Sequence, residues 1–182
     1  MKSPLAILFA GLAFSTQAHA APDLTEDVRA RIANAVERYA SAIACAGVKV
    51  QPGNVYLMDP GRLDDRLPKY AVLWTGDIRC QGGSGTEATH LAIATVNTGQ
   101  YVVQPELSSP VIRFDSPVRF VTRVVSVASD TLVLEGKEYA PADPRSNPSV
   151  PVRFTLRADR DGHWKLTDKI HLDKVTDAHG NH

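Results

Sequence analysis

The chain has 182 residues with 43% hydrophobic and 22% charged side chains, and its 20 basic residues balance its 20 acidic residues. This length and composition are typical of one globular domain with its own core, and they argue against a disordered chain. A net charge of zero argues against a general nucleic-acid binder, because such proteins need a strong positive field to displace counterions from phosphate.

The first 20 residues have the pattern of a secretory signal peptide. Lys2 provides the positive start, residues 4–14 form a short apolar core, and A-H-A at 18–20 is a small-x-small cleavage motif. This core is too short for a stable membrane span, no later segment is apolar for long enough to be one, and no cysteine follows the core to carry a lipid. We expect a bacterial protein exported to the periplasm or secreted, with no membrane span or lipid anchor. Cleavage leaves 162 residues with 19 basic and 20 acidic side chains, a net charge of −1.

Cys45 and Cys80 are the only two cysteines. In an oxidising compartment an even, minimal pair indicates one disulfide. Neither cysteine belongs to a C-x-x-C motif, so thiol redox catalysis and zinc binding are disfavoured. In the chain-entropy treatment, closing the loop between the two cysteines stabilises the fold by about 3.8 kcal/mol.

Residues 24–44 predict one amphipathic helix, because Val28, Ile32 and Val36 recur at helical spacing. Everything after this helix is typical of strands and turns, with the clearest alternation of apolar and polar side chains in 152–158. Four prolines predict a loop over 140–151. The predicted strands are 55–58, 70–75, 91–96, 101–104, 118–127, 131–135, 152–158 and 164–170.

One helix followed by hairpin-linked strands indicates a single α+β domain over residues 21–172, followed by a polar tail at 173–182. We expect the helix to pack on a curved, mainly antiparallel sheet, a layout that resembles cystatin-like and NTF2-like folds. The alternative is a small barrel or sandwich with one helix across an end.

The glycine-rich loop after Cys80 is the most distinctive stretch. Glycines at such density let the backbone approach another group closely, and successive N–H groups could bind an anion. No lysine follows the glycines as in a P-loop, and Thr86 replaces the last glycine of a G-x-S-x-G elbow. A plain hairpin connection is the competing interpretation. The candidate contact residues are Gly82, Gly83, Ser84 and Gly85.

Arginines on the predicted strands form a second candidate contact surface. Arg119 and Arg123 share strand parity, and so do Arg153 and Arg157. If their strands pair, the four side chains form a basic strip that suits an acidic protein or an anionic ligand. Carboxylates on neighbouring strands would instead make this an ordinary solvated face.

No motif identifies catalytic residues or a cofactor, so the sequence favours a non-catalytic binding or protein-interaction module. Its expected partner is a protein or a small anionic ligand and not nucleic acid. One alternative is a small enzyme with a pocket between helix and sheet, into which His90 or Asp77 faces. Another is a metal-binding protein that uses the imidazoles of His171, His179 and His182 near the C-terminus.

Overall fold

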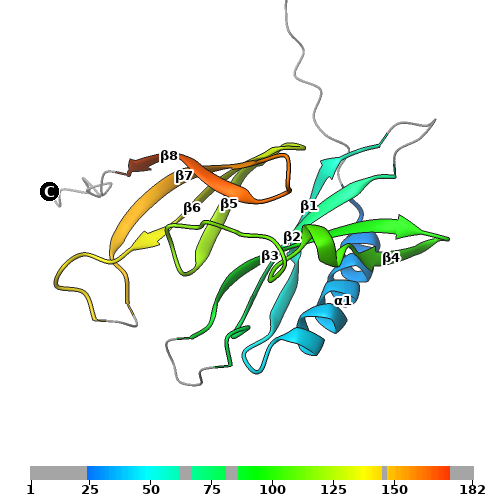
Figure 1. The fold of residues 1–182 in the computed structure, drawn as a ribbon, viewed down its shortest axis with the longest axis horizontal. Helices are drawn as coiled ribbons and strands as arrows, with labels where there is room; N and C mark the ends of the chain where they lie inside the picture. Colours follow the sequence, from blue (N-terminus) through cyan, green and yellow to red (C-terminus); the bar gives the residue numbers. More distant parts are fainter. Residues whose placement is uncertain (1–23, 62–66, 81–85, 145–146, 173–182) are drawn as a thin grey trace, which may run out of the picture.

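The computed structural model describes residues 24–61, 67–80, 86–144 and 147–172. The expected leader, the glycines at 82–85 and the tail from 173 lie outside these described residues. The described elements run in the order α1 (Glu26–Ile43), β1 (Lys49–Asp59), β2 (Lys69–Gly76), β3 (Ala88–Asn97), β4 (Gln100–Val103), the short 3-10 helix η1 (Pro105–Leu107), β5 (Val121–Val127), β6 (Thr131–Glu138), β7 (Val150–Ala158) and β8 (Trp164–His171) (Figure 1).

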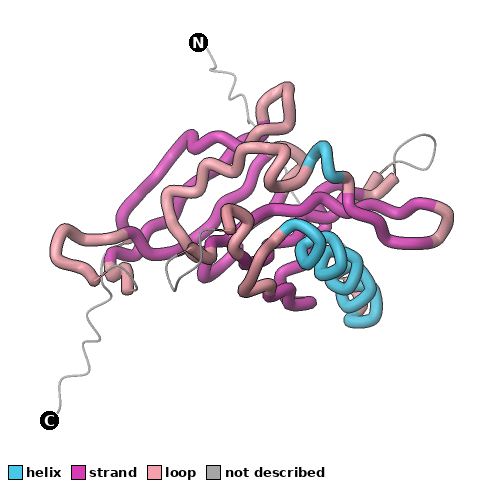
Figure 2. Tube along the Cα trace, turned by 60° about the horizontal axis from the view of Figure 1, so that its bottom comes forward, coloured by secondary structure: helices cyan, strands magenta, loops and turns pink. Residues whose placement is uncertain are grey.

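Helix α1 begins with a favourable N-terminus. The Thr25 hydroxyl accepts a hydrogen bond from the backbone N–H of Val28, and the acidic Glu26 and Asp27 lie in the first turn, where they complement the helix dipole. The helix then buries a face that includes Ile32, Val36 and Ala40, four residues apart. This face packs against the first sheet, so that the helix covers one side of it (Figure 2).

The first sheet is antiparallel, with strand order β1-β2-β3-β4. It is buried on both faces, and β2 shows this best. Val72 and Trp74 pack on the helix side, whereas Ala71 and Leu73 pack against the second sheet. A strand covered on both sides has no polar face, so it is a nearly continuous apolar run rather than an alternating one.

The second sheet is also antiparallel, with strand order β5-β6-β7-β8. Its inner face contributes Leu132 and Leu134 from β6 and Phe154 and Leu156 from β7 to the core between the sheets. The residues between them in each strand are partly or fully exposed. One face of this sheet therefore meets water, as an antiparallel sheet allows.

Helix, first sheet and second sheet thus form three layers with two apolar cores between them. The expected class, α+β with mainly antiparallel strands, is confirmed. The strands expected to form one sheet are divided between two, because the first sheet presents an apolar face on each side. Residues 139–149 form the expected proline-rich loop where they are described, but Pro151 lies inside β7. No helix among the described residues is long and apolar enough to cross a bilayer.

Residues 104–120, here called the linking segment, connect the two sheets. They run along the edge of β3 that β4 leaves unpaired. β4 pairs only with residues 94–97 of that strand. Further back, the Ser108 hydroxyl accepts a hydrogen bond from the Ile93 N–H (2.9 Å), and the Ser109 N–H donates to the Leu91 carbonyl (2.9 Å). The segment thus satisfies much of the strand edge that β4 leaves open.

Candidate functional site

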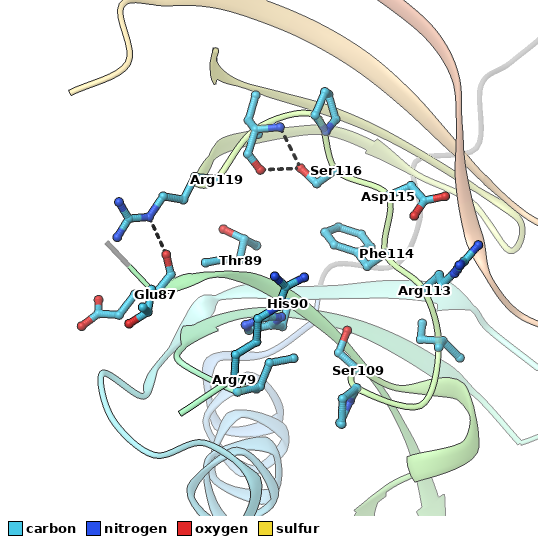
Figure 3. Close-up of a pocket in the computed structure, with 17 residues that line it drawn as sticks. Arg79, Glu87, Thr89, His90, Ser109, Arg113, Phe114, Asp115, Ser116 and Arg119 are labelled. Atoms are coloured by element: carbon cyan, nitrogen blue, oxygen red, sulfur yellow. Dashed lines mark hydrogen bonds between the residues drawn. The ribbon is translucent and has the colours of Figure 1, made fainter. Parts of the chain in front are cut away.

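A cleft of about 630 Å³ opens where the linking segment leaves β3. The segment contacts the strand at Ser109 and returns to it at Arg119, whose carbonyl accepts a hydrogen bond from the Thr89 N–H (2.8 Å). Residues 110–118 between these points bulge away from the strand and form the outer wall of the cleft (Figure 3). The volume lies within the range of small-molecule sites.

The outer wall is fastened to the second sheet through Trp164 at the start of β8. The Trp164 N–H donates to the Arg113 carbonyl (2.8 Å), and its own carbonyl accepts from the Asp115 N–H (2.9 Å). The Arg113 N–H also donates to Nδ1 of His163 (3.1 Å). These bonds hold the backbone of the wall, so the cleft is preformed rather than a gap beneath a loose loop.

Three arginines from two segments line the cleft: Arg79 from the turn after β2, and Arg113 and Arg119 from the segment that links the sheets. The Arg119 Nε–H donates to the Glu87 carbonyl (2.6 Å), and its guanidinium lies 4.7 Å from the centre of the Phe120 ring. Within the described part of the chain, no hydrogen bond or ion pair engages the guanidinium of Arg79 or Arg113, and both residues are exposed.

Two carboxylates, Glu87 and Asp115, also line the cleft. Three arginines against two carboxylates leave the lining with a net charge of +1 while His90 is neutral. Asp115 also interacts electrostatically with Lys165 on β8, outside the lining. The lining therefore has an excess of guanidinium groups, which bind carboxylates and phosphates through two parallel N–H donors.

His90 is half-buried beside the arginine-bearing walls. Its Nε2 lies 3.0 Å from the Gly76 carbonyl, and its ring centre lies 4.8 Å from that of Trp74. Burial lowers the pKa of His90 below the usual 6.5, and the nearby Arg79 charge lowers it further, although the Gly76 hydrogen bond acts in the opposite direction. The ring is neutral at pH 7. Because a carbonyl only accepts, Nε2 carries the proton, which leaves Nδ1 as the acceptor.

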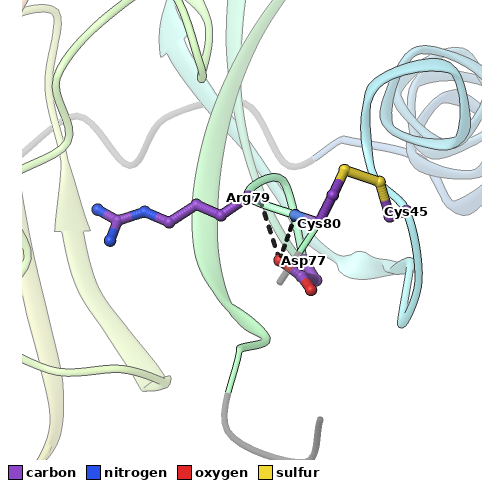
Figure 4. Close-up of a disulfide and its surroundings, with 4 residues drawn as sticks. All are labelled: Cys45, Asp77, Arg79 and Cys80. Atoms are coloured by element: carbon purple, nitrogen blue, oxygen red, sulfur yellow. Dashed lines mark hydrogen bonds between the residues drawn. A yellow bond between two sulfur atoms is a disulfide. The ribbon is translucent and has the colours of Figure 1, made fainter. Parts of the chain in front are cut away.

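The disulfide holds the loop that carries Arg79. Cys45, just after α1, is bonded to Cys80, with 5.3 Å between the two Cα atoms, which confirms the expected pairing (Figure 4). The buried Asp77 Oδ1 accepts hydrogen bonds from the N–H groups of Arg79 (3.0 Å) and Cys80 (3.1 Å). Asp77 therefore shapes this turn, and the disulfide anchors it to the end of the helix.

The arginines expected to form one strip lie in different surroundings. β6 separates β5 from β7, so Glu135 lies in register between Arg123 and Arg153 and forms ion pairs with both, at 3.6 and 2.6 Å. Arg157 is exposed, paired in register with Thr131 of β6. Arg119 precedes β5 and lines the cleft, away from this row.

The remaining sequence candidates are placed only in part. Gly82, Gly83, Ser84 and Gly85 lie outside the described residues, as do His179 and His182. His171 ends β8, with Nε2 3.6 Å from a carboxylate oxygen of Glu138. Over the described ranges, no group of three or more His, Cys, Asp or Glu side chains is arranged to hold a metal ion.

Sequence reasoning missed Arg79 and Arg113 as candidate contact residues. Neither belongs to a motif, and they are far apart along the chain. The available signal was that Arg79 directly precedes Cys80, because a disulfide constrains the backbone of the residue next to it. Nothing in the sequence indicated that residues 110–118 would bulge away from β3.

Comparison with models of known families, with curated proteins and with solved structures finds no match to this chain. Its class is therefore defined by its own fold and cleft. The described residues form an α+β domain of one α-helix and two antiparallel four-stranded sheets, with an arginine-lined cleft beside the segment that joins the sheets.

Proposed function

We propose that this protein is an exported binding module that holds an anionic ligand in the cleft between β3 and residues 110–118. The observation that carries the proposal is the convergence of three arginines onto one preformed cleft, Arg79 from the turn after β2 and Arg113 and Arg119 from the segment that links the sheets. The positive charges of guanidinium groups in one cleft repel one another, so an anion bound there gains charge-assisted hydrogen bonds and also relieves that repulsion.

Export is supported by two features together. The first 20 residues have the composition of a secretory leader, and Cys45 and Cys80 form a disulfide, the bond that persists in oxidising compartments. A periplasmic or secreted binding protein meets small anions and acidic segments of other proteins, and both classes carry the carboxylates that guanidinium groups recognise.

The enzyme alternative has one observation in its favour, the half-buried and neutral His90 in the cleft wall. Two observations count against the expected pocket between helix and sheet, into which His90 or Asp77 would face. The space between helix and sheet is filled by side chains such as Ile32, Val36 and Trp74. Asp77 is not among the described residues that line the cleft, and its Oδ1 accepts hydrogen bonds from the backbone of its own turn. We therefore favour binding without catalysis.

Calorimetric titration with benzoate at low salt tests the proposal, with chemical-shift mapping to locate the site. We expect saturable binding, shifts confined to residues around the cleft, and weaker affinity in Arg113→Gln. Arg157→Gln is the matched control, because Arg157 is an exposed arginine on a strand away from the cleft. Absence of binding, or equal weakening in both variants, would overturn the proposal.

A further inference from the structure

Resting on this proposed function, we infer that the ligand carries two carboxylates joined by an apolar spacer. Arg79 holds one carboxylate, Arg113 holds the other, and the spacer lies against Phe114. The claim concerns the chemistry of the ligand and goes beyond the binding of an anion.

The first anchor is Arg79, in the turn that follows β2. Its backbone is fixed by the Asp77 carboxylate and by the adjacent disulfide. Its side chain extends toward His90, whose pKa it perturbs (Figure 3). A carboxylate bound there receives the guanidinium donors. Because burial lowers the pKa of His90, the imidazole contributes a neutral surface at pH 7 rather than a second charge.

The second anchor is Arg113, on the outer wall. Its backbone is held from both sides by Trp164 and His163. In Figure 3 the Arg113 side chain extends away from Arg79, and the Phe114 ring lies between the two residues in this view. We therefore assign one carboxylate to each guanidinium group. Arg119 differs from these two because its Nε–H already donates to the Glu87 carbonyl and its guanidinium stacks on Phe120.

Apolar and polar side chains both line the cleft. Of the apolar ones, Phe114 lies between the two anchors in the view of Figure 3. A methylene chain that crosses from one anchor to the other would gain contact area against this ring. The position of Phe114 between two guanidinium groups thus favours a ligand with anionic ends and an apolar middle.

Two sources supply this chemistry: a free dicarboxylic acid, or an extended acidic segment of another protein whose two glutamates flank apolar residues. Both would be held by the same two guanidinium groups. The free acid fits within the cleft, whereas a peptide must also leave it at both ends.

The test compares suberate with monomethyl suberate, which has the same length and only one carboxylate. Once one end is held, the second carboxylate binds at high effective concentration, so we expect suberate to bind about tenfold more tightly. Arg79→Gln and Arg113→Gln should each reduce suberate to the affinity of its monoester, and Arg157→Gln should leave the ratio unchanged. Thermal unfolding of each variant verifies that it folds.

An end-blocked Glu-Leu-Leu-Glu peptide distinguishes the two sources. Tighter binding of the peptide than of suberate assigns the ligand to an acidic protein segment, and the reverse order assigns it to a free acid. Equal affinities for suberate and its monoester, with both binding in the cleft, would overturn the two-carboxylate inference but leave the proposed function intact. No binding of any of these anions or of benzoate would overturn the proposed function itself.

Discussion

At the scale of single residues, buried serines supply hydrogen-bond partners at the edge of the first sheet. Ser108 is fully buried, and its hydroxyl accepts from the Ile93 N–H and donates to the Gln104 carbonyl (2.7 Å). One serine thus satisfies two backbone groups that β4 does not reach. Half-buried His90 lies on the same strand, and its pKa lies below 6.5, in a pH range where unfolding can be measured.

Lowering the pH should destabilise the fold through His90. Because burial lowers the pKa of this imidazole below 6.5, the unfolded chain takes up the proton at a higher pH than the folded chain does. Its contribution is therefore nil above about pH 7.5, and the free energy of unfolding falls as the pH drops through 6.5 toward the folded-state pKa. Urea unfolding measured across this range should show a smaller loss in His90→Gln.

His171→Gln is the control for this measurement, since His171 is exposed at the end of β8. If it reduces the pH dependence as much as His90→Gln does, the destabilisation does not originate at the buried imidazole.

At the scale of elements, the linking segment fits against β6 through a glycine. A Cβ added at Gly136 would lie 2.6 Å from Cγ2 of Val118 and 2.7 Å from the carbonyl oxygen of Phe120. Val118 lines the cleft, and Phe120 directly follows Arg119. The absence of a side chain at Gly136 thus leaves the space that Val118 and Phe120 occupy, and so helps to place the cleft wall.

Gly136→Ala should therefore destabilise the protein by about 1–3 kcal/mol, because a backbone oxygen cannot yield as the end of a flexible side chain can. Gly53→Ala is the matched control: its added Cβ meets nothing within 4 Å, and we expect a change near zero. Urea unfolding of both variants measures the difference. Equal effects of the two substitutions would contradict the close contact at Gly136.

At the scale of the whole molecule, the first sheet is the middle one of three layers and is buried on both sides. The disulfide joins Cys45, just after the helix, to Cys80 in the loop after β2. The bond closes a loop between residues 35 positions apart. It also holds the turn that carries Arg79, so it contributes to the global fold and to the cleft.

Cys45→Ala should lower the free energy of unfolding by about 3–4 kcal/mol, mainly because the unfolded chain regains its conformational freedom. It should also weaken anion binding in the cleft. Reductant should destabilise the native protein to a similar extent and leave the variant unchanged, which denaturant titrations with and without dithiothreitol measure. If reductant shifts both proteins equally, the effect does not arise from this disulfide.

The sequence predicted elements where a single face is buried. The helical spacing of Ile32 and Val36 and the alternation around Phe154 each have one apolar side, so their periodicity indicates both the element and its buried face. In β2 the apolar run conceals two opposed faces, because Val72 and Leu73 belong to different cores. A pattern of this kind does not show that a second sheet covers the strand.

By itself, the sequence determined the one helix, the approximate strands and the disulfide, because local periodicity, turn chemistry and the count of cysteines are properties of neighbouring or few residues. Only the tertiary structure decided that the strands form two sheets, that Glu135 separates Arg123 from Arg153, and that the cleft brings distant arginines together. These features depend on which strands pair and where the linking segment leaves β3, and pairing between distant segments leaves no periodic mark in the chain.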